Sequence, residues 1–157
     1  TTFYDFYILV DDSFEEKYKL LMNGYFEKYA KRCRIIFKSV GNVFENAPLH
    51  TDFIGRPTYY RLLISCLIQE NKCIYLDSDT IVCTDLQDLF EIDMQENYIA
   101  GVKAPAYIVG GEKEDYCRQA LLPDIKQYVN AGVLLMNLEQ MRKNSLADKF
   151  LSLLSFR

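Results

Sequence analysis

The chain has 157 residues, half of them hydrophobic, and carries a net charge of −4 at pH 7. This length and apolar content suit one globular domain with a packed core. The negative charge and the scattered lysines and arginines argue against a nucleic-acid partner, which usually needs a basic patch. No apolar run approaches the roughly 18 residues that a membrane-spanning helix requires.

The first predicted element is an aromatic-rich strand over residues 3–10, which ends in Asp11-Asp12. Ser13 and Glu16 then match a capping box, so we expect a helix to start at Ser13. Apolar side chains at helical spacing mark one face of this helix, namely Phe14, Tyr18, Leu21, Met22, Tyr25 and Tyr29.

A second predicted strand, residues 35–40, leads into a loop over residues 42–56 that holds the only histidine, His50. Pro57 suits the first turn of a helix. The apolar face of that helix is marked by Tyr60, Leu63, Ile64, Leu67 and Ile68. A short apolar strand, residues 73–76, follows it.

The second half of the chain continues the alternation of strands and helices. We expect a short helix at residues 85–89, a strand at 98–103 and a weak helix at 112–122. Residues 129–137 contain an apolar strand, and residues 138–155 form one or two helices. Strands that alternate with helices favour an α/β fold with a largely parallel sheet.

The five cysteines bear on the cell compartment. Five is an odd number, and no two of the cysteines form a C-x-x-C pair. Cys66 and Cys73 lie in apolar patterns and are predicted to be buried thiols. A reducing compartment, such as the cytoplasm, is the simplest inference.

Two aspartates at the end of the predicted strand 73–76 point to a divalent cation. The segment reads Ile74-Tyr75-Leu76-Asp77-Ser78-Asp79-Thr80. In an extended backbone, side chains two positions apart share a side, so Asp77 and Asp79 would be aimed at one point. Carboxylate oxygens are the ligands that Mg²⁺ and Mn²⁺ prefer, and such a cation can hold a phosphate.

The Asp-Ser-Asp pattern alone leaves other interpretations open. A solvated turn after a strand would need no ligand. An EF-hand loop is excluded, because Val82 stands where that loop needs Gly. A phosphatase of the haloacid-dehalogenase type would use Asp77 as nucleophile and Asp79 as acid/base, although it wants Thr or Val where Ile81 stands.

Two further segments carry candidate site residues. Asn130-Ala131-Gly132 interrupts the chain before a buried strand, and small residues there let the backbone approach a ligand closely. Asn130 can both donate and accept hydrogen bonds; the alternative is a plain turn that feeds a core strand. Arg61 lies in an otherwise apolar predicted helix, where its guanidinium would pair with a phosphate or with an acidic residue.

Together, the three segments resemble glycosyltransferase family 8, which includes bacterial lipopolysaccharide galactosyl- and glucosyltransferases and glycogenin. The resemblance rests on residues 58–62, 75–79, 85–90 and 130–138, and on Arg142. It implies a single, partial GT-A domain over residues 1–157, with a mixed, mostly parallel sheet flanked by helices.

The resemblance also implies a retaining enzyme that moves glucose or galactose from UDP-glucose or UDP-galactose to a glycan or lipid-linked acceptor. Asp77 and Asp79 would hold Mn²⁺, or Mg²⁺, on the diphosphate. Arg61 and Ser78 would complete the donor site, and the sugar and acceptor pocket would be lined by Asn130, Ala131 and Gly132. The enzyme would be cytoplasmic and peripheral to the inner face of the membrane.

The chain also departs from the family pattern. We expect it to lack the family's first strand with its uridine-binding Ala-Asp, and also a Gln-Asp pair, a metal-binding His and a Lys that the family carries further on. Ala104-Pro105-Ala106 stands where many members carry an aspartate. We therefore expect the isolated chain to transfer little sugar, or to be a non-catalytic nucleotide-sugar-binding domain. The missing strand would expose a sheet edge through which chains self-associate.

Overall fold

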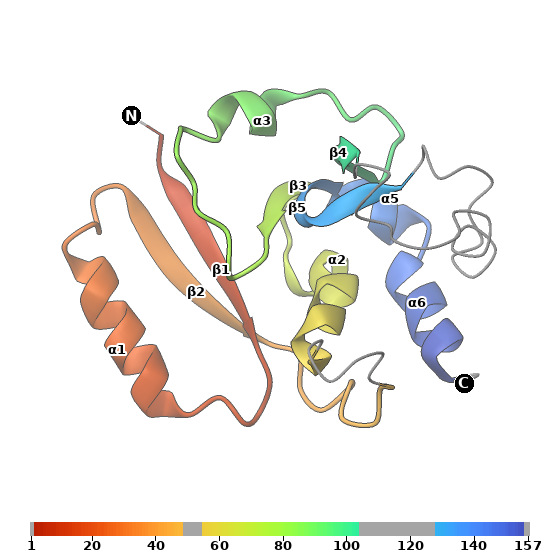
Figure 1. The fold of residues 1–157 in the computed structure, drawn as a ribbon, viewed down its shortest axis with the longest axis horizontal. Coiled ribbons are helices and arrows are strands. Elements are labelled where there is room, and N and C mark those ends of the chain that lie inside the picture. The colour runs from red at the N-terminus through yellow and green to blue at the C-terminus, as the bar shows by residue number, and fades with distance from the viewer. Residues whose placement is uncertain (1, 49–54, 104–127, 156–157) are drawn as a thin grey trace. The chain divides into compact units, whose positions relative to one another are not determined.

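The computed structural model describes residues 2–48, 55–103 and 128–155 (Figure 1). They form two compact units: the first is drawn from residues 1–69 and 141–157, the second from residues 70–140. The single domain expected over residues 1–157 stays a prediction. Among the described residues, no helix is long and apolar enough to cross a membrane.

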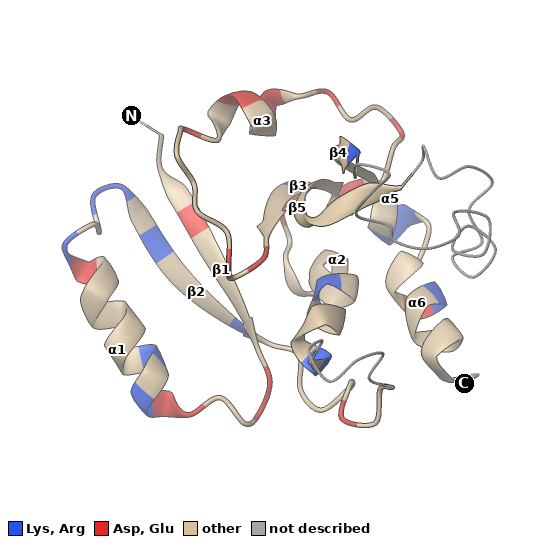
Figure 2. Ribbon diagram, in the orientation of Figure 1, with Lys and Arg blue, Asp and Glu red and all other residues tan. Residues whose placement is uncertain are grey.

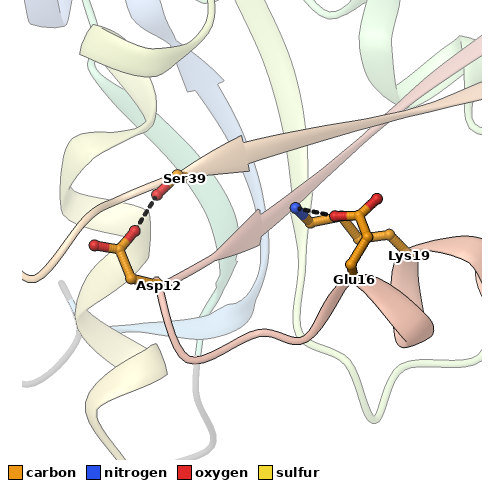
Figure 3. A network of polar contacts seen from close by, with 4 residues as sticks. All are labelled: Asp12, Glu16, Lys19 and Ser39. Atoms are coloured by element: carbon orange, nitrogen blue, oxygen red, sulfur yellow. Dashed lines mark hydrogen bonds and ion pairs between the residues drawn. The ribbon is translucent and has the colours of Figure 1, made fainter.

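The first unit is built on two parallel strands, β1 (Tyr4–Val10) and β2 (Cys33–Ser39). Parallel strands need a crossover connection, and helix α1 (Glu16–Glu27) provides it. A side-chain hydrogen bond links the C-terminal ends of these two strands: the Ser39 hydroxyl donates to Asp12 Oδ1 at 3.1 Å (Figure 3). The predicted strand–helix–strand order is confirmed.

Helix α1 begins at Glu16 rather than at Ser13. The Ser13 N–H and hydroxyl both donate to Asp11 Oδ1, at 2.9 and 2.6 Å, so Ser13 closes a local turn. The residue at the N-cap is Glu15, which makes no capping side-chain bond. Glu16 pairs with Lys19 at 3.0 Å instead (Figure 3). The predicted capping box is therefore wrong.

The rest of the first unit packs around one core cluster. A 3₁₀ helix, η1 (Arg56–Leu63), continues into α2 (Ile64–Leu67), and helix α6 (Leu146–Ser155) belongs to the same unit. The buried members of the cluster are Val40, Phe44, Tyr60, Leu63 and Ala147. The helix predicted after Pro57 is confirmed in place, although it starts in the tighter 3₁₀ form. Cys66, predicted to be buried, is exposed.

The second unit is a three-stranded antiparallel sheet in the order β3-β5-β4. Its strands are β3 (Lys72–Leu76), β4 (Ile99–Lys103) and β5 (Val129–Asn137). The short helix α3 (Gln87–Glu91) follows β3, and α5 (Leu138–Lys143) follows β5 directly. The bounds of β5 are those predicted, and its buried residues are Leu134, Leu135 and Met136.

The predicted α/β class is confirmed, and the described strands form one parallel and one antiparallel sheet. Among the described strands, however, one pairing is parallel and two are antiparallel, so these residues do not form a mostly parallel sheet. The reason is that β5 lies between β3 and β4 and runs opposite to both. The order of strands and helices along a chain does not reveal such an insertion.

Candidate functional site

Asp77 is the first residue after β3, in one of the two acidic segments that follow strands β1 and β3 (Figure 2). Its backbone N–H donates to the Gly132 carbonyl at 2.8 Å, which ties the end of β3 to β5. The Tyr75 hydroxyl donates to Asp77 Oδ1 at 2.6 Å. Tyr75 and Asp77 are two positions apart at the end of a strand, so alternation places them on one side. The half-buried Asp77 is therefore held at its backbone by Gly132 and at its carboxylate by Tyr75.

Asp79 is positioned by a turn, and not by strand alternation as predicted. The Thr80 N–H donates to the Asp77 carbonyl at 3.2 Å, so residues 77–80 form a turn. Ser78 and Asp79 are exposed in this turn, whereas Asp77 is half-buried. The expectation of an extended backbone through both aspartates is wrong, but the two carboxylates still belong to one short turn.

Strand β5 contributes the other side of the site. The Gly132 N–H donates to the side-chain oxygen of Asn130 at 2.8 Å. A Cβ on Gly132 would lie 3.2 Å from Asp77 Oδ2 and 3.1 Å from Asn130 Oδ1, closer than ordinary van der Waals contact. A Cβ at this position would require Asp77 or Asn130 to shift by a few tenths of an ångström, and glycine avoids that shift. The structure thus brings Asp77, Asn130 and Gly132 together, with Ala131 exposed between the last two.

The two aspartates suit a cation that takes its remaining ligands from substrate. Within residues 2–48, 55–103 and 128–155, no three His, Cys, Asp or Glu side chains gather to hold a metal ion. Mg²⁺ is nevertheless often bound by one or two carboxylates, with water and substrate phosphates completing its shell. Asp79 makes no side-chain hydrogen bond or ion pair with the described residues, so its oxygens are available. The donor set therefore fits a cation–diphosphate site.

Arg61 belongs to the first unit, where it lies half-buried in η1. Its Nε donates to the Thr58 carbonyl at 2.9 Å, and its Nη2 donates to the Thr58 hydroxyl at 3.1 Å. These bonds orient the guanidinium, and its contact with a donor phosphate stays a prediction. His50 and the segment 104–106 lie outside the described residues.

Tyr75 was not predicted as a site residue. The sequence did carry a signal for it, because Tyr75 precedes Asp77 by two residues and alternation puts both side chains on one side of the strand.

Asn137, at the end of the Asn-Ala-Gly strand, has a structural role. Its side-chain oxygen accepts from the Gln140 N–H at 3.1 Å, so it caps helix α5. Its amide also donates to the Gln95 carbonyl at 3.1 Å.

The sequence of the chain is similar to that of known glycosyltransferases. The family model described as "Glycosyl transferase family 8" matches residues 2–157. A putative glycosyltransferase of Haemophilus influenzae is 31% identical over 147 residues, which cover 92% of this chain and 43% of that protein. Glycosyltransferase GlyF of Streptococcus pneumoniae is 27% identical over 154 residues, covering 95% and 33% respectively. The chain thus spans less than half the length of these relatives.

Solved structures show the same fold. The crystal structure of galactosyltransferase LgtC with donor and acceptor sugar analogues matches 97% of this chain and 65% of that chain, with a TM-score of 0.74 and 22% identity. Glycosyltransferase GlyE of Streptococcus pneumoniae matches 98% and 32%, with a TM-score of 0.64 and 26% identity. The predicted GT-A fold is confirmed. Because the family match includes both aspartates and the Asn-Ala-Gly segment, the chain belongs to glycosyltransferase family 8.

Proposed function

We propose that the protein containing this chain transfers glucose or galactose from a UDP-sugar to a glycan or lipid-linked acceptor, such as a lipopolysaccharide, with retention of configuration. The observation that carries the proposal is the turn at residues 77–80, which anchors Asp77 beside Gly132 and leaves Asp79 available in solvent. Membership of a sugar-transferring family favours this function over the phosphatase alternative.

Asp77 and Asp79 are the proposed ligands of Mn²⁺ or Mg²⁺. When bound, the cation would act as a Lewis acid that neutralises charge on the departing UDP. Tyr75 fixes Asp77 Oδ1 by a hydrogen bond, which leaves Oδ2 as the oxygen that faces Gly132. The turn therefore combines one carboxylate oriented by a hydrogen bond with one exposed to solvent, where an incoming diphosphate and its cation would reach it.

The remaining proposed roles concern the rest of the donor and the acceptor. Ser78, exposed in the same turn, would contact the nucleotide, and Arg61 would supply positive charge to the donor phosphates. Asn130, Ala131 and Gly132 would line the sugar and acceptor pocket. The exposure of Asn130 and Ala131 on β5 supports this assignment, because exposed residues are accessible to a ligand.

Location and association follow from the same proposal. An acceptor attached to lipid would place the protein in the cytoplasm, at the inner face of a membrane. Within the described strands, β1 pairs with β2 alone, so one of its edges is unpaired in the first unit. An unpaired edge offers main-chain donors and acceptors to another strand, which supports self-association through this edge.

The decisive experiment is a thermal-shift titration with UDP, UDP-glucose and UDP-galactose, with and without Mn²⁺. We expect a stabilisation of about 1–3 kcal/mol when ligand is well above its dissociation constant. This stabilisation should require Mn²⁺ and disappear in Asp79→Asn, because the amide cannot replace the carboxylate as a cation ligand.

Asp88→Asn is the matched control for this substitution. Asp88 is an exposed aspartate of helix α3, outside the turn, so the variant should keep the full Mn²⁺-dependent shift. A shift that survives in Asp79→Asn, or that needs no Mn²⁺, would refute the proposed cation site.

A further inference from the structure

A cavity of about 180 Å³, lined by apolar as well as polar groups, lies at the carboxyl ends of the parallel strands β1 and β2, and the residues that line it all belong to the first unit. The residues that matter to its chemistry are Asp11, Asn42, Phe44, Glu45, Arg56 and Tyr60. In open α/β sheets, ligands bind beyond the carboxyl ends of the strands. The cavity therefore occupies a position where ligand binding is common, and none of the residues that line it belongs to the turn at residues 77–80.

The cavity combines buried aromatic rings with exposed polar side chains. Phe44 and Tyr60 are 2% and 6% exposed, and their rings stack with centroids 6.0 Å apart. Asn42, Glu45 and Arg56 are exposed. None of these three side chains forms a hydrogen bond or ion pair with another residue in the described part of the chain. Their donors and acceptors are therefore available to a ligand.

Asp11 connects the two parts of the cavity. Its Oδ1 accepts from the Ser13 N–H and hydroxyl, and its Oδ2 accepts from the Tyr60 hydroxyl. These bonds, that of the Ser13 hydroxyl first, hold the pKa of the Asp11 carboxyl below its usual value. Since a carboxylate oxygen has two lone pairs, Oδ2 can accept a further hydrogen bond. Asp11 is thus a pre-oriented, ionised acceptor.

The charges decide which ligand class fits. Among the described residues that line the cavity, Arg56 is the positive one, while Asp11 and Glu45 are negative, so a simple anion would be repelled by two carboxylates. A sugar ring suits the mixture, since its hydroxyls donate to carboxylates and also accept from a guanidinium or an amide. The volume is below the roughly 300–1,000 Å³ of pockets for drug-sized ligands, which suits a single ring.

We propose that this cavity is a carbohydrate subsite that binds one sugar ring of a glycan. Asp11 and Glu45 would accept hydrogen bonds from the ring hydroxyls, and Asn42 and Arg56 would donate to them. Its role in holding an acceptor glycan rests on the proposed transferase function, whereas the binding of a sugar ring does not.

The test is a ¹H–¹⁵N NMR titration of the full 157-residue chain with methyl β-galactopyranoside and methyl α-glucopyranoside. We expect saturable shifts of the backbone amides of Gly41, Asn42 and Arg56 with at least one of these sugars. Arg56→Gln and Asn42→Ala should weaken the apparent affinity about tenfold, the usual loss when a hydrogen bond to a charged or polar group is removed. Both substituted residues are exposed, so the variants should fold.

Matched controls separate the cavity from general surface effects and from the aspartate turn. Arg32→Gln and Asn23→Ala change exposed residues elsewhere in the first unit and should leave the titration unchanged. The shifts should also persist in Asp79→Asn. Shifts that vanish in Asp79→Asn, affinities that are unaltered in Arg56→Gln and Asn42→Ala, or no saturable shift at these amides would each overturn the subsite. None of these outcomes changes the Mn²⁺–UDP result, so the two proposals can fail independently.

Discussion

At the scale of single residues, Gly132 decides how closely the two strands of the candidate site approach. Its carbonyl accepts from the Asp77 N–H, and its N–H donates to Asn130. The space where a side chain would stand is taken by Asp77 Oδ2 and Asn130 Oδ1. The glycine of the Asn-Ala-Gly segment is therefore favoured by close packing against a carboxylate and an amide, and not by an unusual backbone angle.

Gly132→Ala should damage both stability and cation-dependent binding. The added methyl group must displace Asp77 Oδ2 or Asn130 Oδ1, and such overpacking typically lowers the free energy of unfolding by about 1–3 kcal/mol. Displacement of Asp77 should also weaken Mn²⁺–UDP binding about tenfold, a change of about 1.4 kcal/mol. Urea unfolding and the thermal-shift titration measure the two effects.

Gly24→Ala is the matched control, because nothing lies within 4 Å of a Cβ at that position in helix α1. It should raise the free energy of unfolding by about 0.5–1 kcal/mol, as alanine does in a helix interior. Equal effects of the two substitutions would show that Gly132 is not closely packed against the site.

At the scale of elements, a side-chain hydrogen bond joins the end of β1 to η1. The Tyr60 hydroxyl donates to Asp11 Oδ2, and Tyr60 also belongs to the core cluster of the first unit. Burial first, and then the Asp11 carboxylate, raises the pKa of Tyr60 from 10.0 to about 12. The phenol therefore stays protonated in the folded protein at a pH where it ionises in the unfolded chain.

This pKa difference predicts a specific loss of stability in alkali. The contribution of Tyr60 to folding is fully present below pH 10.0 and is lost as the pH rises through the folded value of about 12. Over this range the free energy of unfolding of the wild type should fall by about 2 kcal/mol more than that of Tyr60→Phe, which cannot ionise. The measurement is urea unfolding of both proteins at pH values from about 8 to about 12, which would reveal the difference between their free energies of unfolding.

Tyr25→Phe removes an exposed tyrosine hydroxyl from α1 and serves as the control. Its stability should follow that of the wild type across the same pH range. Parallel curves for the wild type and Tyr60→Phe would contradict the coupling between β1 and η1.

Helix α1 shows where the helical pattern was a poor guide to packing. Phe26 packs edge-on against Phe6 of β1, with ring centroids 5.6 Å apart. No residue of α1 is fully buried, however, and the exposed side chains of its apolar pattern are Tyr18, Leu21, Tyr25 and Tyr29. Periodicity predicts that a helix forms, but which side of it is covered depends on what lies beside it.

At the scale of the whole molecule, the first unit is discontinuous in sequence, and Arg142 joins its two parts. The Arg142 Nη1 donates to the carbonyls of Ser65 and Ile68 at 3.2 and 3.0 Å, and Nη2 donates to that of Gln69 at 3.3 Å. These carbonyls lie at the end of α2, where a helix leaves acceptors unpaired and favours positive charge. The Arg142 side chain thus supplies hydrogen-bond donors to the carbonyls at the end of α2, a helix far away in the sequence.

Arg142→Met should lower the free energy of unfolding by about 2–3 kcal/mol, since it removes hydrogen bonds from a charged group to partly buried carbonyls. Arg142→Lys should lose less, because an ammonium keeps the charge but not the planar fork of donors. Lys149→Met, at an exposed position of α6, is the control and should change stability little. Chemical unfolding measures all three, and equal stability of Arg142→Met and Lys149→Met would refute the role of Arg142.

The sequence by itself determined the strands around the site, the acidic pair, the Asn-Ala-Gly segment and the resemblance to glycosyltransferase family 8. These are local patterns. Strand β5, for example, keeps its predicted bounds because a short apolar run bounded by polar residues is typical of a buried strand. Only the tertiary structure decided that β5 lies between β3 and β4, that Gly132 meets Asp77, and that a turn holds Asp79. The first two outcomes depend on hydrogen bonds and packing between residues far apart in sequence, which no local periodicity encodes. The turn is local, but its bond from the Thr80 N–H to the Asp77 carbonyl ends the strand alternation on which the sequence prediction relied.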